Sequence, residues 1–298
     1  MLFTLSWLKF QKDYNIIFIG DIMKLNVKII SIILAVSMFL CIFPVSYASD
    51  ETPSLIKYGF VNCNGADIEY GIYGSKEKEP LLLLPPNGGD MHSFDGSILP
   101  EMAKHFMVIV VSPRGTGNSD WIEGTMNFET MSDDLAIILD YLSIEKTNIF
   151  GFSDGGNLGV VFTLAHQDRV KSLVIMGSNI NTWGTNTFDQ IQITYQYIVL
   201  CVEAWLYGDE ETKIRRDIKG MMVGQPDLTF KDISAIKVPV LNIFGEHDMI
   251  QRWHSKKITK SIEGAEELMI IGGGHSTCFE YTDTVINPAL LEFYGVAE

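Results

Sequence analysis

The chain has 298 residues, of which 47% are hydrophobic and 20% charged, and this ordinary globular composition excludes a disordered chain or a fibrous repeat. Its 37 acidic and 22 basic side chains give a net charge of −15. Nucleic acids and anionic lipids both attract clustered Lys and Arg, so this charge disfavours both kinds of partner. The composition therefore predicts an acidic soluble domain.

The N-terminal residues have the pattern of a secretory signal peptide. Residues 29–43 are apolar apart from two serines, two lysines precede them, and Ser46-Tyr47-Ala48 follows in the A-x-A arrangement of a cleavage site. This run of 15 residues is shorter than the ~20 that a membrane-spanning helix needs. We therefore expect cleavage near Ala48 and a secreted or extracytoplasmic chain that begins near Ser49. Retention as a membrane anchor is the alternative. Met23 opens a better signal peptide than Met1 does. An alternative interpretation is therefore that residues 1–22 are a start-site artefact.

The exported chain offers little for disulfide or metal chemistry. Residues 1–48 carry four lysines and two aspartates, so their removal takes away a net charge of +2 and leaves −17. The remaining cysteines are Cys63, Cys201 and Cys278, an odd number with wide spacing that fits neither a disulfide framework nor a zinc pattern. A chain of about 250 residues buries enough apolar surface without a bridge. We expect the cysteines to be incidental.

Strand and helix patterns alternate through most of the chain. Two stretches of alternating polarity, residues 55–61 and 66–73, predict an antiparallel hairpin. After Pro80, short and nearly continuous apolar runs are typical of strands buried on both faces, and helix-period patterns lie between several of them. We therefore expect an α/β fold with a mostly parallel sheet and helices on both faces. The further predicted strands are residues 81–84, 106–111, 147–150, 170–176, 238–244 and 267–271, and the predicted helices are residues 131–142, 158–166, 255–262 and 288–294.

One insertion interrupts this alternation. Residues 179–230 contain no strand-like run but are rich in aromatic side chains, among them Trp183, Tyr195, Trp205 and Tyr207. This composition predicts a small helical lid over one end of the sheet, within a single domain that spans residues 49–298. We expect most of the aromatic side chains to form the lid's own small core.

The sharpest chemical motif is Gly151-Phe152-Ser153-Asp154-Gly155-Gly156, between a predicted strand and a helical stretch. G-x-S-x-G in this context is a nucleophile elbow, a turn so tight that the residues two before and two after the serine must be small. The serine stands at the carboxyl end of the strand, beside a helix N-terminus that favours developing negative charge. A phosphate-binding glycine loop is the competing interpretation, but Lys and the G-x-G-x-x-G spacing are absent. Ser153 is therefore the candidate nucleophile.

A serine nucleophile needs a base and a carboxylate that orients the base, in the chain order Ser, Asp or Glu, His. Asp248 and His275 each follow a predicted strand, so both lie at the sheet edge where open α/β sheets place their sites. We predict Asp248 as the acid and His275 as the base. Glu246 is the alternative acid. His247 is an alternative base, although it is expected rather to shape the turn. No metal site is expected at Glu246-His247-Asp248, because the side chains of adjacent residues diverge on a turn.

Acyl transfer also requires N–H donors that hold the oxyanion. The elbow supplies the N–H of Asp154, and a second donor is expected from the loop Pro85-Pro86-Asn87-Gly88-Gly89-Asp90 after the strand at residues 81–84. Proline has no N–H, so Asn87 is the first residue of this loop that is able to donate, with Gly88 next.

Together these motifs resemble the α/β-hydrolase superfamily, from roughly residue 57 to the C-terminus. Residues 112–119, Ser-Pro-Arg-Gly-Thr-Gly-Asn-Ser, resemble the D-x-R-G-x-G-x-S loop of its esterase- and peptidase-like members, and residues 84–89 are similar to the L-H-G-x-G-G oxyanion loop. In two places the chain departs from the family. Pro85-Pro86 replaces the usual His-Gly, which affects the oxyanion geometry, and Ser112 replaces the usual Asp, which affects the bracing of the loop. A serine nucleophile excludes, by resemblance, dehalogenases and epoxide hydrolases, which use Asp.

Together with the predicted signal peptide, these motifs and the resemblance imply a secreted serine hydrolase that needs no cofactor and cleaves a small carboxylic ester through an acyl-enzyme, by means of Ser153, His275 and Asp248. An amidase, an aminopeptidase or a lactonase of the same fold is the enzymatic alternative. A catalytically silent binding protein with this fold is the alternative from another class. The expected partner is a small-molecule ester or amide, and the sequence does not indicate an oligomeric state.

Overall fold

The computed structural model of the protein describes residues 53–296. The predicted signal peptide, residues 1–48, lies outside the described residues. Over residues 53–296, no helix combines the length and the apolar character that crossing a membrane requires.

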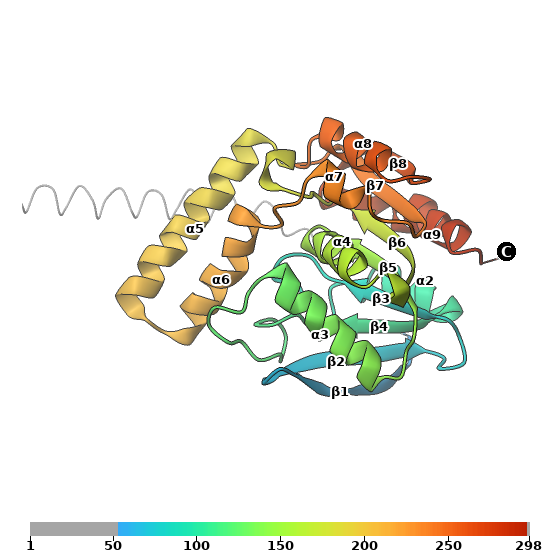
Figure 1. Cartoon of the computed structure of the whole chain (residues 1–298), viewed down its shortest axis with the longest axis horizontal. Coiled ribbons are helices and arrows are strands. Elements are labelled where there is room, and N and C mark those ends of the chain that lie inside the picture. The colour runs from blue at the N-terminus through green and yellow to red at the C-terminus, as the bar shows by residue number, and fades with distance from the viewer. Residues whose placement is uncertain (1–52, 297–298) are drawn as a thin grey trace, which may run out of the picture. The chain divides into compact units, whose positions relative to one another are not determined.

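The described residues form one eight-stranded sheet with the order β1-β2-β4-β3-β5-β6-β7-β8 (Figure 1). β1 and β2 form an antiparallel hairpin around Asn64 and Gly65, which both have positive φ, and β2 is also antiparallel to β4. All later pairings are parallel, so the predicted hairpin and mostly parallel sheet are confirmed. The strands are β1 (Leu55–Cys63), β2 (Ala66–Gly74), β3 (Pro80–Leu84), β4 (Met107–Val111), β5 (Thr147–Phe152), β6 (Val170–Met176), β7 (Val240–His247) and β8 (Glu266–Gly274).

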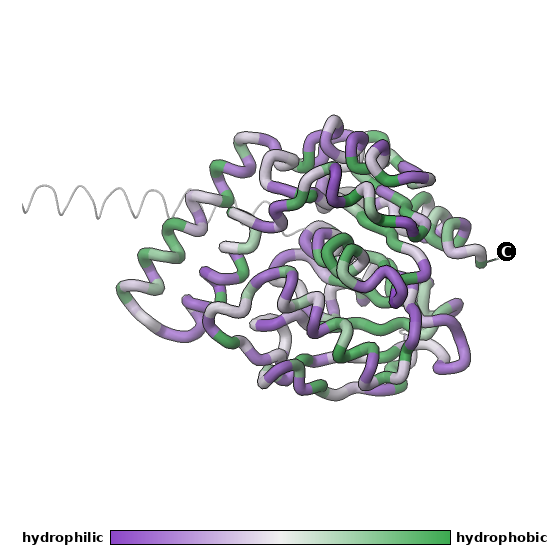
Figure 2. Tube along the Cα trace, viewed as in Figure 1, coloured by the Kyte–Doolittle hydropathy of each residue, from purple (hydrophilic) through white to green (hydrophobic). Residues whose placement is uncertain are grey.

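Helices cover both faces of the sheet, because successive strand residues point to opposite sides and nearly all of them are apolar. Leu82 and Leu84 belong to a core shared with α3, α4 and α8, whereas Leu81 and Leu83 belong to a core shared with α2 and α9. Figure 2 shows hydrophobic residues along the central strands. The helices around the sheet are α2 (Ile98–His105), α3 (Phe128–Tyr141), α4 (Asp154–Ala165), α8 (Arg252–Ser261) and α9 (Asn287–Phe293).

Helix α2 was not predicted from the sequence. It has only eight residues, and Pro100 lies in its first turn, the one position in a helix where proline is tolerated. Its buried side chains include Ile98, Leu99 and Met102. Packing against the sheet therefore stabilises a segment whose length alone would make a helix marginal.

The insertion between β6 and β7 forms the helical hairpin of α5 (Thr187–Tyr207) and α6 (Glu210–Gly224), followed by the short α7 (Phe230–Ile233) (Figure 1). Gly208 ends α5 in the left-handed conformation, and the side chain of Asp209 caps the first turn of α6 by accepting from the N–H of Thr212. The expected aromatic core of this segment is wrong. Trp183, Trp205 and Tyr207 are 82%, 81% and 73% exposed.

Candidate active site

Ser153 is held at a sharp turn between β5 and α4, as the motif predicts. Its backbone has φ 54° and ψ −122°, a conformation that costs on the order of 1–3 kcal/mol for a residue other than glycine. A Cβ on Gly151 would collide with the carbonyl of Gly155, and a Cβ on Gly155 would collide with the carbonyl of Leu84. Glycine at both positions therefore permits the turn that presents the serine hydroxyl above the sheet.

The structure brings Ser153, His275 and Asp248 into one hydrogen-bonded chain. His275 Nε2 lies 3.0 Å from Ser153 Oγ, and His275 Nδ1 lies 2.7 Å from Asp248 Oδ1. The Asp248 side chain is buried, and its Oδ1 also accepts a hydrogen bond from the N–H of Ile250 at 2.9 Å. With Nδ1–H donating to Asp248, Nε2 is left as the acceptor for the hydroxyl proton of Ser153.

The imidazole of His275 is also fixed by packing. The ring of Phe152, the residue before the nucleophile, lies 5.1 Å from it between centroids. On another side, a Cβ on Gly177 would lie 3.1 Å from His275 Cε1 and 3.2 Å from Asp248 Oδ2. Glycine after β6 therefore leaves the room in which the base and the acid approach each other.

Glu246, His247 and His254 lie outside this hydrogen-bonded chain. Glu246 Oε2 accepts a hydrogen bond from the N–H of Gly272 at 3.1 Å, and the His247 side chain is exposed. His254 is fully buried, its Nε2 accepts from the N–H of Ile180, and burial lowers its pKa to about 4. Across the described residues, no group of three or more His, Cys, Asp or Glu side chains is placed to hold a metal ion.

The predicted oxyanion loop forms a tight turn. The N–H of Gly89 donates to the carbonyl of Pro86 at 2.8 Å, and Gly88 has φ 72°, so Asn87 and Gly88 are the central residues of the turn. Asp154, the first residue of α4, has no intrahelical acceptor for its N–H. Both predicted donors therefore belong to segments that border Ser153, and their role stays a prediction.

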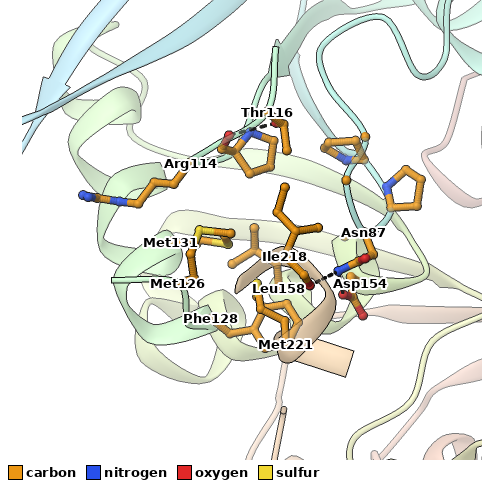
Figure 3. Close-up of a pocket in the computed structure, with 16 residues that line it drawn as sticks. Asn87, Arg114, Thr116, Met126, Phe128, Met131, Asp154, Leu158, Ile218 and Met221 are labelled. Atoms are coloured by element: carbon orange, nitrogen blue, oxygen red, sulfur yellow. Dashed lines mark hydrogen bonds between the residues drawn. The ribbon is translucent and has the colours of Figure 1, made fainter. Parts of the chain in front are cut away.

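The side chain of Asn87 makes two contacts that the sequence did not indicate. Its Nδ2 donates to Asp154 Oδ2 at 2.9 Å and to the carbonyl of Ile218 on α6 at 2.7 Å (Figure 3). Burial raises the pKa of Asp154 to about 6 despite this hydrogen bond. Asn87 thus links the oxyanion loop, the elbow and the helical insertion, and no motif in the chain could have indicated that link before α6 was placed.

Helix α6 also closes an apolar cavity of about 30 Å³ behind the elbow (Figure 3). A separate cavity of about 10 Å³ is lined by Ser153 together with Ile193 of α5 and Met222 of α6. The insertion therefore contributes part of the wall around the nucleophile. The larger cavity is lined by the oxyanion loop and by side chains that include Met126, Phe128, Met131, Leu158, Ile218 and Met221.

In the loop at residues 112–119, Ser112 replaces the usual Asp, and a carboxylate from strand β2, that of Glu69, contacts the loop instead. Glu69 Oε2 accepts from Ser112 Oγ at 2.6 Å and from the N–H of Asn118 at 3.0 Å, and its Oε1 accepts from Tyr58 and from the Asn118 side chain. Burial alone would raise the pKa of Glu69, but these hydrogen bonds outweigh it and lower the pKa to about 2. The available signal was a loop that lacks its Asp, together with a glutamate, Glu69, in an otherwise largely apolar strand.

We expect Glu69→Gln to destabilise the fold in a pH-dependent way. A depressed carboxyl pKa stabilises the folded state above about pH 4.5, and this stabilisation is lost as the pH falls towards 2. The substitution should therefore lower the free energy of unfolding by about 3 kcal/mol at pH 7, and by about 2 kcal/mol less than that at pH 3. Urea unfolding of both proteins at the two pH values measures it, and a pH-independent difference would contradict the role of the ionised carboxylate.

Comparisons with known proteins agree with this architecture. A family model described as the alpha/beta hydrolase fold matches residues 79–197. The chain is 22% identical over 245 residues to the serine hydrolase BPHL of Homo sapiens, an alignment that covers 75% of this chain and 81% of that protein. It is 29% identical over 116 residues to a 2-hydroxymuconate semialdehyde hydrolase of a Pseudomonas species, covering 38% of this chain and 41% of that protein.

Among solved structures, the enol-lactonase of Burkholderia xenovorans superposes with a TM-score of 0.63 at 21% sequence identity, covering 79% of this chain and 99% of the enzyme. At this identity the superposition supports the fold. The family model, the hydrolases among the curated relatives and the sheet order all lead to the same conclusion. The chain has the α/β-hydrolase fold, and its residues 79–197 match the model of that family.

Proposed function

We propose that the protein is a serine hydrolase that cleaves a small carboxylic ester through an acyl-enzyme. The observation that carries this proposal is the hydrogen-bonded chain from Ser153 Oγ through the imidazole of His275 to Asp248, with distances of 3.0 and 2.7 Å. The 3.0 Å between Oγ and Nε2 is within the range over which a nucleophile passes its proton to its base, and the 2.7 Å hydrogen bond to Asp248 orients the imidazole. The strained elbow supports the proposal, since such strain is concentrated at active sites.

The proposed reaction has two half-reactions. His275 Nε2 takes the hydroxyl proton as Ser153 Oγ bonds to the substrate carbonyl carbon, and Asp248 stabilises the resulting imidazolium. When the tetrahedral intermediate collapses, the ester C–O bond breaks and the imidazolium gives its proton to the departing alcohol. Water then loses a proton to His275 and attacks the acyl carbon. When this second tetrahedral intermediate collapses, the C–Oγ bond breaks, the imidazolium returns its proton to Ser153 Oγ, and the acid leaves. The N–H groups of Asn87 and Asp154 are the proposed donors to the oxyanion in both intermediates.

We expect the kcat values of two variants to distinguish the two candidate acids, Asp248 and Glu246. Asp248→Ala should lower kcat by on the order of 10⁴, because the imidazole loses the carboxylate that sets its tautomer. Glu246→Ala is the matched control, since that carboxylate contacts Gly272 and Arg252 and not the base, and kcat should change by less than about threefold. Steady-state hydrolysis of a nitrophenyl ester measures both. The reverse pattern would assign the acid to Glu246.

The oxyanion loop is tested at Asn87 by separating its backbone N–H from its side chain. Asn87→Ala keeps the N–H but removes the contacts with Asp154 and Ile218, so we expect kcat to fall less than about tenfold, the effect of one or two ordinary hydrogen bonds. Asn87→Pro also removes the N–H and should lower kcat by roughly 10²–10³. Circular dichroism must show that both variants fold. If a folded Asn87→Pro protein keeps native turnover, the second donor lies elsewhere, with Gly88 the next candidate.

Two experiments separate the candidate functions, and the first uses a reagent that reacts with activated serines. A fluorophosphonate probe should label the wild-type protein at Ser153, as mass spectrometry of the peptide would show, and should label neither Ser153→Ala nor His275→Ala. A folded wild-type protein that resists the probe would indicate a silent binding protein instead. A panel of an ester, an amide and a lactone of matched acyl size then separates the enzymatic alternatives, with the ester expected to have the highest kcat/KM.

Secretion forms a separate part of the proposal, supported by the apolar run at residues 29–43 and the A-x-A arrangement after it. N-terminal sequencing of the protein recovered from outside the cytoplasm should begin near Ser49. A protein that retains residues 29–43 in the membrane fraction would contradict cleavage.

A further inference from the structure

Helix α5 presents a continuous apolar face that nothing in the described residues covers. Its inner side, with Ile193, Leu200 and Ala204, is buried. The outer side is exposed at positions that follow one another at alternating spacings of three and four residues. These positions are Phe188, Ile191, Tyr195, Ile198, Val202 and Trp205, with exposures between 47% and 81%.

The apolar face extends beyond this stripe. Val199, Leu206 and Tyr207 lie next to it on α5, and Trp183 stands at its N-terminal end. Together these exposed side chains present on the order of 1,000 Å² of apolar surface, whereas a monomeric protein rarely exposes a patch of more than a few hundred. An open groove of about 430 Å³ runs along the face, between Trp183 and the side chains of Ile191 and Tyr195. A surface of this size marks an interface.

The charge on α5 narrows the choice of partner. Asp189 and Glu203 are its only charged residues, both are half-buried, and its exposed polar side chains are Thr187, Gln192 and Gln196. Helices that lie on membranes have Lys and Arg on their polar side, which an anionic lipid surface attracts. Because α5 has no basic residue and the whole chain has a net charge of −15, the face favours an uncharged partner surface over anionic lipid.

We propose that α5 pairs with α5 of a second copy of this chain, antiparallel about a two-fold axis. Spacings of three and four residues average 3.5, the period that keeps an apolar seam facing a partner helix along its whole length. With 21 residues, α5 is about 31 Å long. In an isologous pair, Phe188 lies opposite Trp205 of the second copy, Ile191 opposite Val202, and Tyr195 opposite Ile198. The exposed area is sufficient, because a stable interface buries about 800 Å² per partner.

The charges at the two ends of α5 favour the antiparallel direction. Asp209, Glu210 and Glu211 form an exposed acidic turn at the C-terminal end. At the N-terminal end, Ile250 pairs with Thr185 in an isolated β-bridge, and Arg252 follows two residues later. Arg252 is exposed, and its Nη1 lies 3.7 Å from Glu246 Oε1. An antiparallel pair brings the acidic turn of one copy toward Arg252 of the other, whereas a parallel pair places the two acidic turns side by side. The pair also joins the helices that wall the two active sites.

The test measures the oligomeric state of the protein, purified in the form in which the cell that produces it accumulates it. By sedimentation velocity at tens of micromolar, the wild type should be a dimer. Ile198→Glu buries two carboxylates near the two-fold axis and should raise the dimer dissociation constant at least 100-fold, giving a monomer. Ile271→Glu is the matched control, since Ile271 is 66% exposed on β8, away from this face, and it should remain dimeric. Ile191→Glu is a second variant for the case that Ile198→Glu does not fold, as judged by circular dichroism.

Three outcomes would overturn the proposal. One is a wild-type protein that is monomeric at 100 µM. Another is a dimer that survives both Ile198→Glu and Ile191→Glu, since its interface must then lie elsewhere in the chain. The third is a monomer that floats with vesicles of phosphatidylcholine and phosphatidylglycerol and loses this binding in Ile198→Glu, which would assign the face to a lipid surface. Fluorophosphonate labelling of Ser153 is independent of all three results, so the proposed function is tested separately.

Discussion

Ser153→Ala and His275→Ala should each lower kcat for ester hydrolysis by on the order of 10⁴ or more, and the double variant should lose scarcely more than either one. Such non-additivity is expected because the serine is a nucleophile only while the imidazole takes its proton, and the 3.0 Å separation of Oγ and Nε2 makes the two side chains one unit. The measurement is initial-rate hydrolysis of a nitrophenyl ester by the two single variants and the double variant.

The control for this experiment is His254→Gln, because His254 is buried in α8 and contacts the N–H of Ile180 instead of the nucleophile. A fold-stability measurement on each variant separates lost chemistry from lost structure. Turnover that falls multiplicatively in the double variant would show that Ser153 and His275 act independently, and the proposed mechanism would be wrong.

We expect Asp134→Ala to lower the free energy of unfolding by about 3–5 kcal/mol, because it leaves a buried guanidinium without its carboxylate. Arg114 is 1% exposed and donates from Nε and Nη2 to the two carboxylate oxygens of Asp134, at 2.6 and 2.7 Å, and from Nη2 to the carbonyl of Cys63 at 2.8 Å. The hydrogen bonds with Asp134 raise the pKa of Arg114, so the charge persists. This pair anchors the loop at residues 112–119 to α3 and β1.

Urea unfolding followed by circular dichroism measures this effect. Glu263→Ala is the control, because its pair with Lys237 is exposed and its loss should cost less than about 1 kcal/mol. The double variant Arg114→Met with Asp134→Leu should recover most of the lost stability, since an apolar pair of similar volume needs no desolvated charge. A single Asp134→Ala variant as stable as the control would mean that the guanidinium finds another partner.

The mostly parallel sheet and the order of the candidate catalytic residues could be predicted from the sequence because both depend on local patterns. Near-continuous apolar runs such as residues 81–84 and 170–176 are compatible with burial on both faces, and the glycines around Ser153 meet a steric demand of one turn. The same reasoning placed Asp248 and His275 at strand ends, and the structure brings them within hydrogen-bonding distance of each other. Helix α2 escaped prediction because its helical state depends on packing against the sheet.

Tertiary structure alone decided which groups far apart in the chain share a contact. Ser112 meets Glu69 because β2 and β4 are neighbours in the sheet, and Asn87 meets the carbonyl of Ile218 because α6 folds back over the elbow. It also decided that most aromatic side chains of residues 179–230, Trp205 among them, face outward instead of forming a core. The sequence shows which side chains are apolar, but burial depends on what packs against them, and no described residue packs against the outer face of α5.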